Sequence, residues 1–90
     1  MAKQKTLSAE EQAELAARAP LVELKRSAEA ARAEAMAGPY SPERWAPWQA
    51  AAQELHAAIT QHAAAHGVNR FEVESWVTYQ VLHAEDNDSA

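Results

Sequence analysis

The stretch Ile59–Val77, ITQHAAAHGVNRFEVESWV, decides how this chain folds. It contains the end of one helical pattern, a glycine at position 67, and the start of a second helical pattern with almost no linker between them. Gly67 suits the turn because glycine readily adopts the left-handed backbone conformation that ends many helices. Asn69 can cap the second helix, and Glu72 can complete a capping box three residues later. The stretch therefore predicts two helices joined by a tight turn.

Residues 71–82 also admit a second interpretation, as a strand. The residues that alternate along this segment are Phe71, Val73, Ser75, Val77, Tyr79 and Val81. Most of them are β-branched or aromatic, and such residues favour strands. A single strand in an otherwise helical chain would have nothing to pair with unless the chain dimerised. A helix is therefore the favoured prediction, and the strand stays open.

Upstream, capping and proline signals define two more helices. Ser8 with Glu11 forms a capping box that starts the first helix. Pro20 lacks the backbone N–H that a helix interior needs, so it predicts a break near residues 18–19. A second helix is then expected from Pro20 to about Ala37, with a narrow seam of small and apolar residues along one face.

A Gly/Pro hinge at residues 38–42 separates these helices from the third. Gly38 suits a left-handed helix end, Ser41 suits the next N-cap, and the third helix is expected to end at His66. Pro47 lies in the early turns of that helix, which predicts that residues 43–46 form a separate short turn.

Composition predicts the fold class. The 90 residues include 23 alanines but only 13 Leu, Ile, Val and Phe, with 2 Gly and 4 Pro. Alanine is the best helix former, so we expect an all-α protein, a small bundle of three to four helices. Because it has few large apolar residues for a core, a second copy could complete the core by dimerisation. We expect one helical domain over residues 7–83, between a disordered N-terminus at 1–6 and an acidic disordered tail at 84–90.

Several classes of protein find no support in the sequence. The chain has no cysteine, which excludes disulfides, thiolate metal sites and cysteine nucleophiles. It has no apolar run of about 20 residues and no signal-peptide pattern at its start, so we expect a cytoplasmic protein with no membrane partner. No glycine-rich phosphate loop or arrangement of catalytic groups is evident, and we expect neither enzymatic activity nor a cofactor.

The turn around Gly67 resembles a helix-turn-helix motif. Ala63, Gly67, Val73 and Trp76 match the small residue, the turn glycine and the two apolar positions of that motif. The resemblance implies a small DNA-binding transcriptional regulator that acts as a dimer. The residues that it would place toward the DNA groove are Asn69, Arg70, Glu72, Glu74 and Ser75.

The distribution of charge favours a protein partner instead. The net charge is -5, and residues 46–90 hold one arginine against six acidic residues, whereas residues 1–45 are balanced. DNA affinity depends on Lys and Arg that neutralise phosphates, so the acidic half would repel DNA. The favoured prediction is a non-enzymatic, acidic protein–protein interaction module: an adaptor, an antitoxin-like protein or an inhibitor that meets a basic or apolar surface. DNA binding is the alternative, and a homodimer fits either.

Aromatic and acidic residues are the candidates for partner binding. They are Tyr40, Trp45, Trp48, Phe71, Glu72, Glu74 and Trp76. Trp and Tyr are frequent anchors of interfaces, but aromatic residues at helical spacing also build cores, and both interpretations stay open.

His62 and His66 lie one helical turn apart. This spacing is found in zinc-binding helices, and it would also let two imidazoles repel each other when both are charged. A metal site would need a third ligand from elsewhere in the fold. The plainer interpretation places both histidines at the solvent-exposed end of the third helix's apolar seam.

Overall fold

The computed structural model describes residues 7–83, and this part of the chain is entirely helical. Its four helices are α1 (Ala9–Ala16), α2 (Ala19–Met36), α3 (Pro42–His66) and α4 (Arg70–Leu82). The predicted all-α fold is confirmed, and residues 71–82 form a helix, as favoured over the strand. The disorder predicted for residues 1–6 and 84–90 lies outside the described residues.

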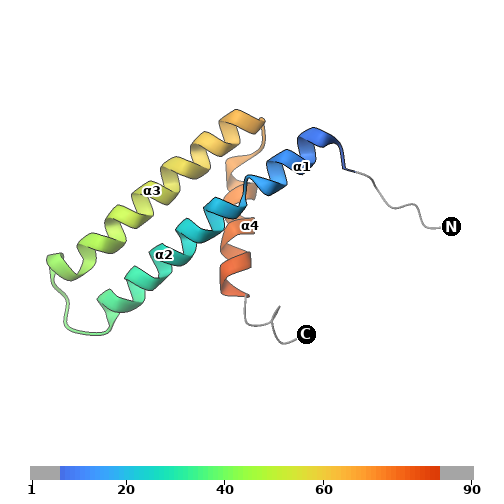
Figure 1. The fold of residues 1–90 in the computed structure, drawn as a ribbon. Coiled ribbons are helices and arrows are strands. Elements are labelled where there is room, and N and C mark those ends of the chain that lie inside the picture. Colours follow the sequence, from blue (N-terminus) through green and yellow to red (C-terminus); the bar gives the residue numbers. More distant parts are fainter. Residues whose placement is uncertain (1–6, 84–90) are drawn as a thin grey trace.

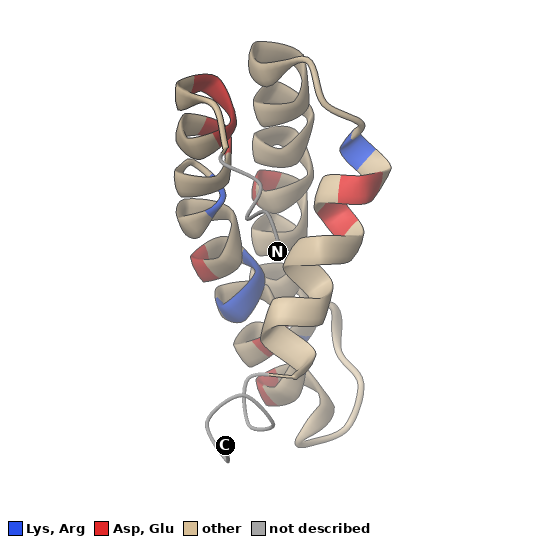
Figure 2. Ribbon diagram, turned by 90° about the vertical axis from the view of Figure 1, so that its right-hand side faces the viewer, with Lys and Arg blue, Asp and Glu red and all other residues tan. Residues whose placement is uncertain are grey.

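The helices form an open arrangement around one hairpin. α2 and α3 run antiparallel side by side, α4 crosses them, and α1 extends beyond the start of α2 (Figure 1). The radius of gyration is 16.0 Å, whereas a compact domain of this length has about 12 Å. Charges are spread unevenly: α1 and α2 carry many, α3 carries few, and α4 carries its charges in its first turns (Figure 2).

Side-chain caps start three of the helices. Ser8 and Glu11 form the predicted capping box at α1. The Ser41 hydroxyl accepts a hydrogen bond from the Arg44 N–H at the start of α3. The Asn69 side chain accepts from two backbone N–H groups in the first turn of α4, at 2.8 and 3.1 Å. Each cap satisfies backbone donors that a helix start leaves unpaired.

The turn between α3 and α4 is built as predicted. Gly67 has φ 64° and ψ 36°, in the left-handed region. The N–H groups of Gly67 and Val68 both donate to the carbonyl of Ala63, which closes the end of α3. A side chain at position 67 would be strained at this φ, so the turn requires glycine.

The prediction of a left-handed cap at Gly38 is wrong. Among the described residues only Gly67 has a positive φ, and α2 ends with Ala37 in a right-handed turn whose N–H donates to Glu34. Gly38 instead makes room for Arg44, whose guanidinium donates to the Glu34 carbonyl at 3.0 Å. A Cβ at position 38 would lie 2.9 Å from that guanidinium.

The separate turn predicted for residues 43–46 is also wrong, because α3 runs without interruption through Pro47. Pro47 is exposed, so its missing hydrogen bond leaves no buried group unpaired. The flanking residues Trp45 and Trp48 are half-buried and pack edge to face, with ring centroids 5.6 Å apart. These packed indoles lie on both sides of Pro47 and favour the helical backbone there, against the local preference of proline to break the helix.

The hydrophobic core is small and lies at one end of the hairpin. Leu21, Ile59, Val73 and Val77 are its buried members, contributed by α2, α3 and α4. Farther along the hairpin the buried positions of α2 are alanines, as the predicted seam requires. Such small side chains allow α2 and α3 to approach closely but bury little apolar area. Stability therefore depends on the place where α4 crosses the hairpin.

Candidate functional site

The two faces of α4 differ sharply. Val73 and Val77 are fully buried against the hairpin. Phe71, Tyr79 and Leu82 are respectively 67%, 55% and 63% exposed. These three residues are spaced by eight and three positions, which places them on one side of a helix with 3.6 residues per turn. We call the side formed by Phe71, Ser75, Thr78, Tyr79 and Leu82 the outer face of α4.

The outer face of α4 is apolar, with small hydroxyl groups between large side chains. The Tyr79 ring stacks on His83 at a centroid distance of 4.2 Å, which holds it against the end of the helix. A shallow hollow of about 440 Å³ lies beside it, lined by Glu74, Ser75, Thr78, Tyr79, Leu82 and His83. A helix with apolar residues on both faces is usually covered on both.

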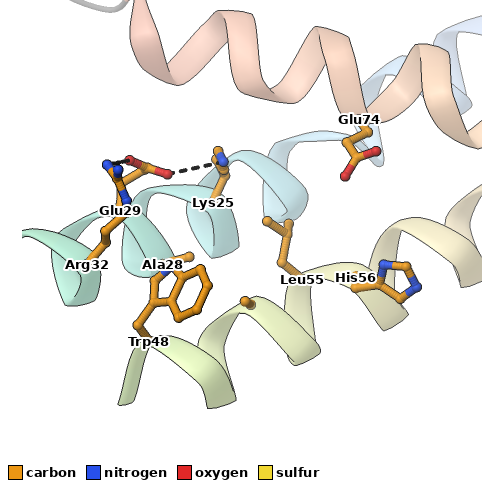
Figure 3. Close-up of a pocket in the computed structure, with 9 residues that line it drawn as sticks. Lys25, Ala28, Glu29, Arg32, Trp48, Leu55, His56 and Glu74 are labelled. Atoms are coloured by element: carbon orange, nitrogen blue, oxygen red, sulfur yellow. Dashed lines mark ion pairs between the residues drawn. The ribbon is translucent and has the colours of Figure 1, made fainter. Parts of the chain in front are cut away.

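A groove opens next to this face, where α4 crosses the hairpin. Its volume is about 360 Å³, and we call it the α2–α4 groove (Figure 3). Its lining residues are Lys25, Ala28, Glu29, Arg32, Trp48, Ala52, Leu55, His56 and Glu74. Small and apolar residues of α2 and α3 form its floor, and charged residues form its rim.

Opposite charges face each other across the α2–α4 groove. On α2, Glu29 pairs with Lys25 at 3.1 Å and lies 4.0 Å from Arg32, so two cations share one carboxylate. On α4, Glu74 extends over the groove from the other side (Figure 3). No residue within 7–83 forms an ion pair with Glu74. The rim therefore holds a surplus cation on one side and an unpaired anion on the other.

A buried ionic network lies on the opposite side of α4. Arg18, between α1 and α2, donates from Nε to Glu14 and from its two terminal nitrogens to Glu72, at 3.0 and 3.2 Å. His62 of α3 lies 2.7 Å from Glu14. The Arg18 guanidinium also lies 5.1 Å from the centre of the Trp76 ring. One arginine thus links α1 to α4, and Glu14 links α1 to α3.

The network holds its charges firmly. Burial raises the pKa of Glu14, but hydrogen bonds from Arg18 and His62 outweigh it and lower the pKa below its ordinary value. Burial lowers the pKa of Arg18, and the carboxylates of Glu72 and Glu14 raise it by more. Glu14 is therefore an ionised acceptor at neutral pH. Because an ionised carboxylate only accepts hydrogen bonds, Nε2 of His62 must carry a proton.

This network corrects two predictions. The capping box at α4 is incomplete, because the Glu72 carboxylate binds Arg18 instead of reaching back to Asn69. A charged bidentate pair is stronger than the neutral backbone bond with which it competes. His62 is buried rather than solvent-exposed, and the Glu14 carboxylate of α1 lies 2.7 Å from its ring. His66 alone lies at the exposed end of the seam.

Most residues that the helix-turn-helix resemblance assigns to DNA are used within the fold. Asn69 caps α4, and Glu72 binds Arg18. Arg70 folds back on α3, where it donates to Thr60 at 3.2 Å and lies 2.9 Å from Nδ1 of His56. The two remaining positions, 74 and 75, are exposed.

The predicted partner-binding residues do not form one surface. Tyr40 is exposed in the α2–α3 loop, whereas Phe71 is exposed at the start of α4, and these two places lie at opposite ends of the hairpin (Figure 1). The indoles of Trp45, Trp48 and Trp76 are all half-buried. Only Phe71 and Glu74 of the predicted set lie on or beside the outer face of α4.

The two histidines of α3 stay close, with ring centroids 4.6 Å apart. Within residues 7–83, no three His, Asp or Glu side chains gather so that they could hold a metal ion.

None of the helices in that part is both long and apolar enough to cross a membrane.

The sequence analysis missed Tyr79, Leu82 and Glu14. Tyr79 and Leu82 share a helical face with Phe71, a signal that becomes visible once residues 71–82 are taken as a helix. Glu14 and Arg18 are spaced by four in a helical region, a common spacing for ion pairs. Their burial has no sequence signal, because it depends on α3 and α4 arriving from more than 40 residues away.

Comparison of the chain with protein-family models, with curated proteins and with solved structures gave no match.

Proposed function

We propose that this chain is a non-enzymatic protein-interaction module whose docking surface is the outer face of α4. The observation that carries the proposal is that α4 has apolar side chains on two opposite faces, of which only one is buried. Val73 and Val77 secure one face to the hairpin, and three large apolar side chains remain exposed on the other. The helix is thus held rigidly while it presents an apolar stripe.

Such a stripe suits a partner that offers a complementary apolar surface. An amphipathic helix binds in this way when its anchor residues recur on one face, as Phe71, Tyr79 and Leu82 do. Aromatic residues provide large contact areas at low cost in side-chain entropy. The acidic second half of the chain favours a partner with basic groups around that apolar surface.

Adaptor, antitoxin-like and inhibitor roles all belong to this class of function. The DNA-binding alternative has less support, because Asn69, Arg70 and Glu72 are occupied by contacts within the fold. A surface that reads DNA needs such side chains to be free to reach the bases and phosphates.

A cytoplasmic location remains a prediction.

Partner capture with matched variants tests the proposal. The full chain is used as bait, in parallel with Phe71→Ser, Leu82→Ser and the control Met36→Ser. Met36 is 58% exposed on α2, so the control removes a similar apolar side chain far from α4. We expect the two α4 variants, but not the control, to lose a partner that the parent chain retains. Equal retention by all four chains would reject the outer face as the docking surface.

A DNA titration tests the alternative. Binding through phosphate contacts predicts retention of duplex DNA at about 50 mM salt and steep loss as the salt rises. We expect no mobility shift of genomic fragments with the parent chain. A salt-dependent shift that Arg70→Ala abolishes would favour the DNA-binding alternative.

A further inference from the structure

We propose that the partner of the outer face of α4 is a second copy of this chain, with α4 of each copy lying in the α2–α4 groove of the other. The inference rests on the proposed function, because it uses the same docking surface. It goes further by naming the occupant and the surface that receives it.

The groove and the outer face are continuous. Glu74 lines both the α2–α4 groove and the hollow beside Tyr79 and Leu82. A two-fold axis near this residue would place the outer face of each copy over the groove of the other. The same contact would then be made twice, which is the usual form of a symmetric dimer.

The floor of the groove has the chemistry to receive an apolar helix. Ala28 and Ala52 are small, so a second helix can approach closely, and Trp48 and Leu55 offer apolar surface beside them. Within residues 7–83, the core of one copy has four large buried residues. Small domains with thin cores often gain the burial that they need through association.

The charges of the rim complement each other between copies. Lys25 and Arg32 share the carboxylate of Glu29, which leaves one positive charge over. Glu74 forms no ion pair with any residue in the described part of its own chain. In the proposed dimer, Glu74 of each copy faces Lys25 and Arg32 of the other, and both charges find partners.

Mass measurement in solution gives the first test. Light scattering coupled to size-exclusion chromatography should give twice the chain mass of 9.8 kDa for the parent protein. The double variant Phe71→Ser/Leu82→Ser should give the single-chain mass while keeping the helical circular dichroism signal of the parent. Met36→Ser should remain dimeric, because Met36 lies outside both surfaces.

Charge reversal and mixing give the second test. E74K alone and K25E alone each place like charges opposite each other at both symmetric contacts, and we expect the dimer dissociation constant to rise about tenfold. An equimolar mixture of the two variants restores opposite charges at both contacts. The mixture should therefore dimerise as tightly as the parent. E54K, on an exposed position of α3 outside the groove, should change nothing.

The outcomes separate the inference from the proposed function. A parent chain that keeps the single-chain mass at millimolar concentration would overturn the dimer, as would a dimer that both the double α4 variant and the charge variants leave intact. In either case, the proposed function would still be judged by whether Phe71→Ser and Leu82→Ser lose a different protein partner. Restoration of the dimer in the mixture supports a second copy directly, because no heterologous partner is present.

Discussion

The inner and outer faces of α4 belong to one helix of 13 residues but have opposite surroundings. The inner face buries two valines in the core, and its edge carries Glu72, which binds Arg18. The outer face carries apolar residues that are just as large and makes few contacts within the chain. Apolar character alone therefore does not reveal which residues stabilise the fold. What separates them is whether the crossing of α4 over the hairpin covers them.

The largest effect is expected where the ionic network joins the inner face. Arg18→Ala removes the only cation that contacts the buried carboxylate of Glu14 among the described arginines and lysines. Breaking a buried ion pair leaves an uncompensated charge, so we expect the free energy of unfolding to fall by about 4 kcal/mol. Urea denaturation followed by circular dichroism measures it.

Arg26→Ala is the matched control. Arg26 lies 4.0 Å from Glu23, and both side chains are largely exposed. Its loss should cost less than about 0.5 kcal/mol. Equal costs for the two arginines would mean that the network contributes no more than an ordinary surface pair, and the inner face would then be held by its valines alone.

A smaller loss is expected when the apolar part of the inner face is reduced. Val77→Ala removes two methyl groups from a fully buried position and leaves a small cavity, so the free energy of unfolding should fall by about 2 kcal/mol. Leu82→Ala removes a larger part of a side chain on the exposed face and, measured at high dilution where no dimer forms, should cost less than about 0.5 kcal/mol. The reverse order in thermal denaturation would contradict the assignment of the two faces.

Acid should weaken the network through Glu14. Its pKa is lower in the folded protein than its ordinary value of 4.5, so the folded state releases the proton more readily than the unfolded state. The stabilisation by the Glu14 charge is therefore complete above pH 4.5 and is lost as the pH falls toward the folded value. The stability difference between the parent and Glu14→Gln should shrink in that range. A difference that stays constant down to pH 3 would show that the carboxylate charge contributes nothing.

The parts of the fold that follow from neighbouring residues could be predicted from the sequence. Ser8, Ser41 and Asn69 cap helices, and Gly67 makes the turn, because each feature needs only a few adjacent residues. These local signals were enough to place the helices along the chain. The fold class therefore followed from local chemistry together with the alanine content.

The features that were predicted wrongly depend on how side chains pack in the folded chain. Glu72 leaves its capping position because Arg18 arrives from 54 positions away in the chain. Gly38 is not left-handed and lies against the Arg44 guanidinium, and Pro47 stays helical where tryptophans on both sides are packed. The candidate site belongs to the same class. Whether Phe71 or Val73 faces solvent is decided by which side of α4 meets the hairpin.

A small effect on the stability of the single chain is expected for Phe71→Ser, and this variant is the sharpest test of the outer face. The Phe71 ring is exposed, and the Arg70 guanidinium lies 5.5 Å from the ring centre. Loss of this exposed contact should cost less than about 1 kcal/mol. Association into the proposed dimer would stabilise the parent by mass action, so its melting temperature should rise with protein concentration. The variant Phe71→Ser/Leu82→Ser should show no such rise and should match the parent at high dilution. If instead the double variant unfolds well below the parent even at the lowest concentration, the outer face stabilises the single chain, and the division of α4 into a structural and a docking face fails.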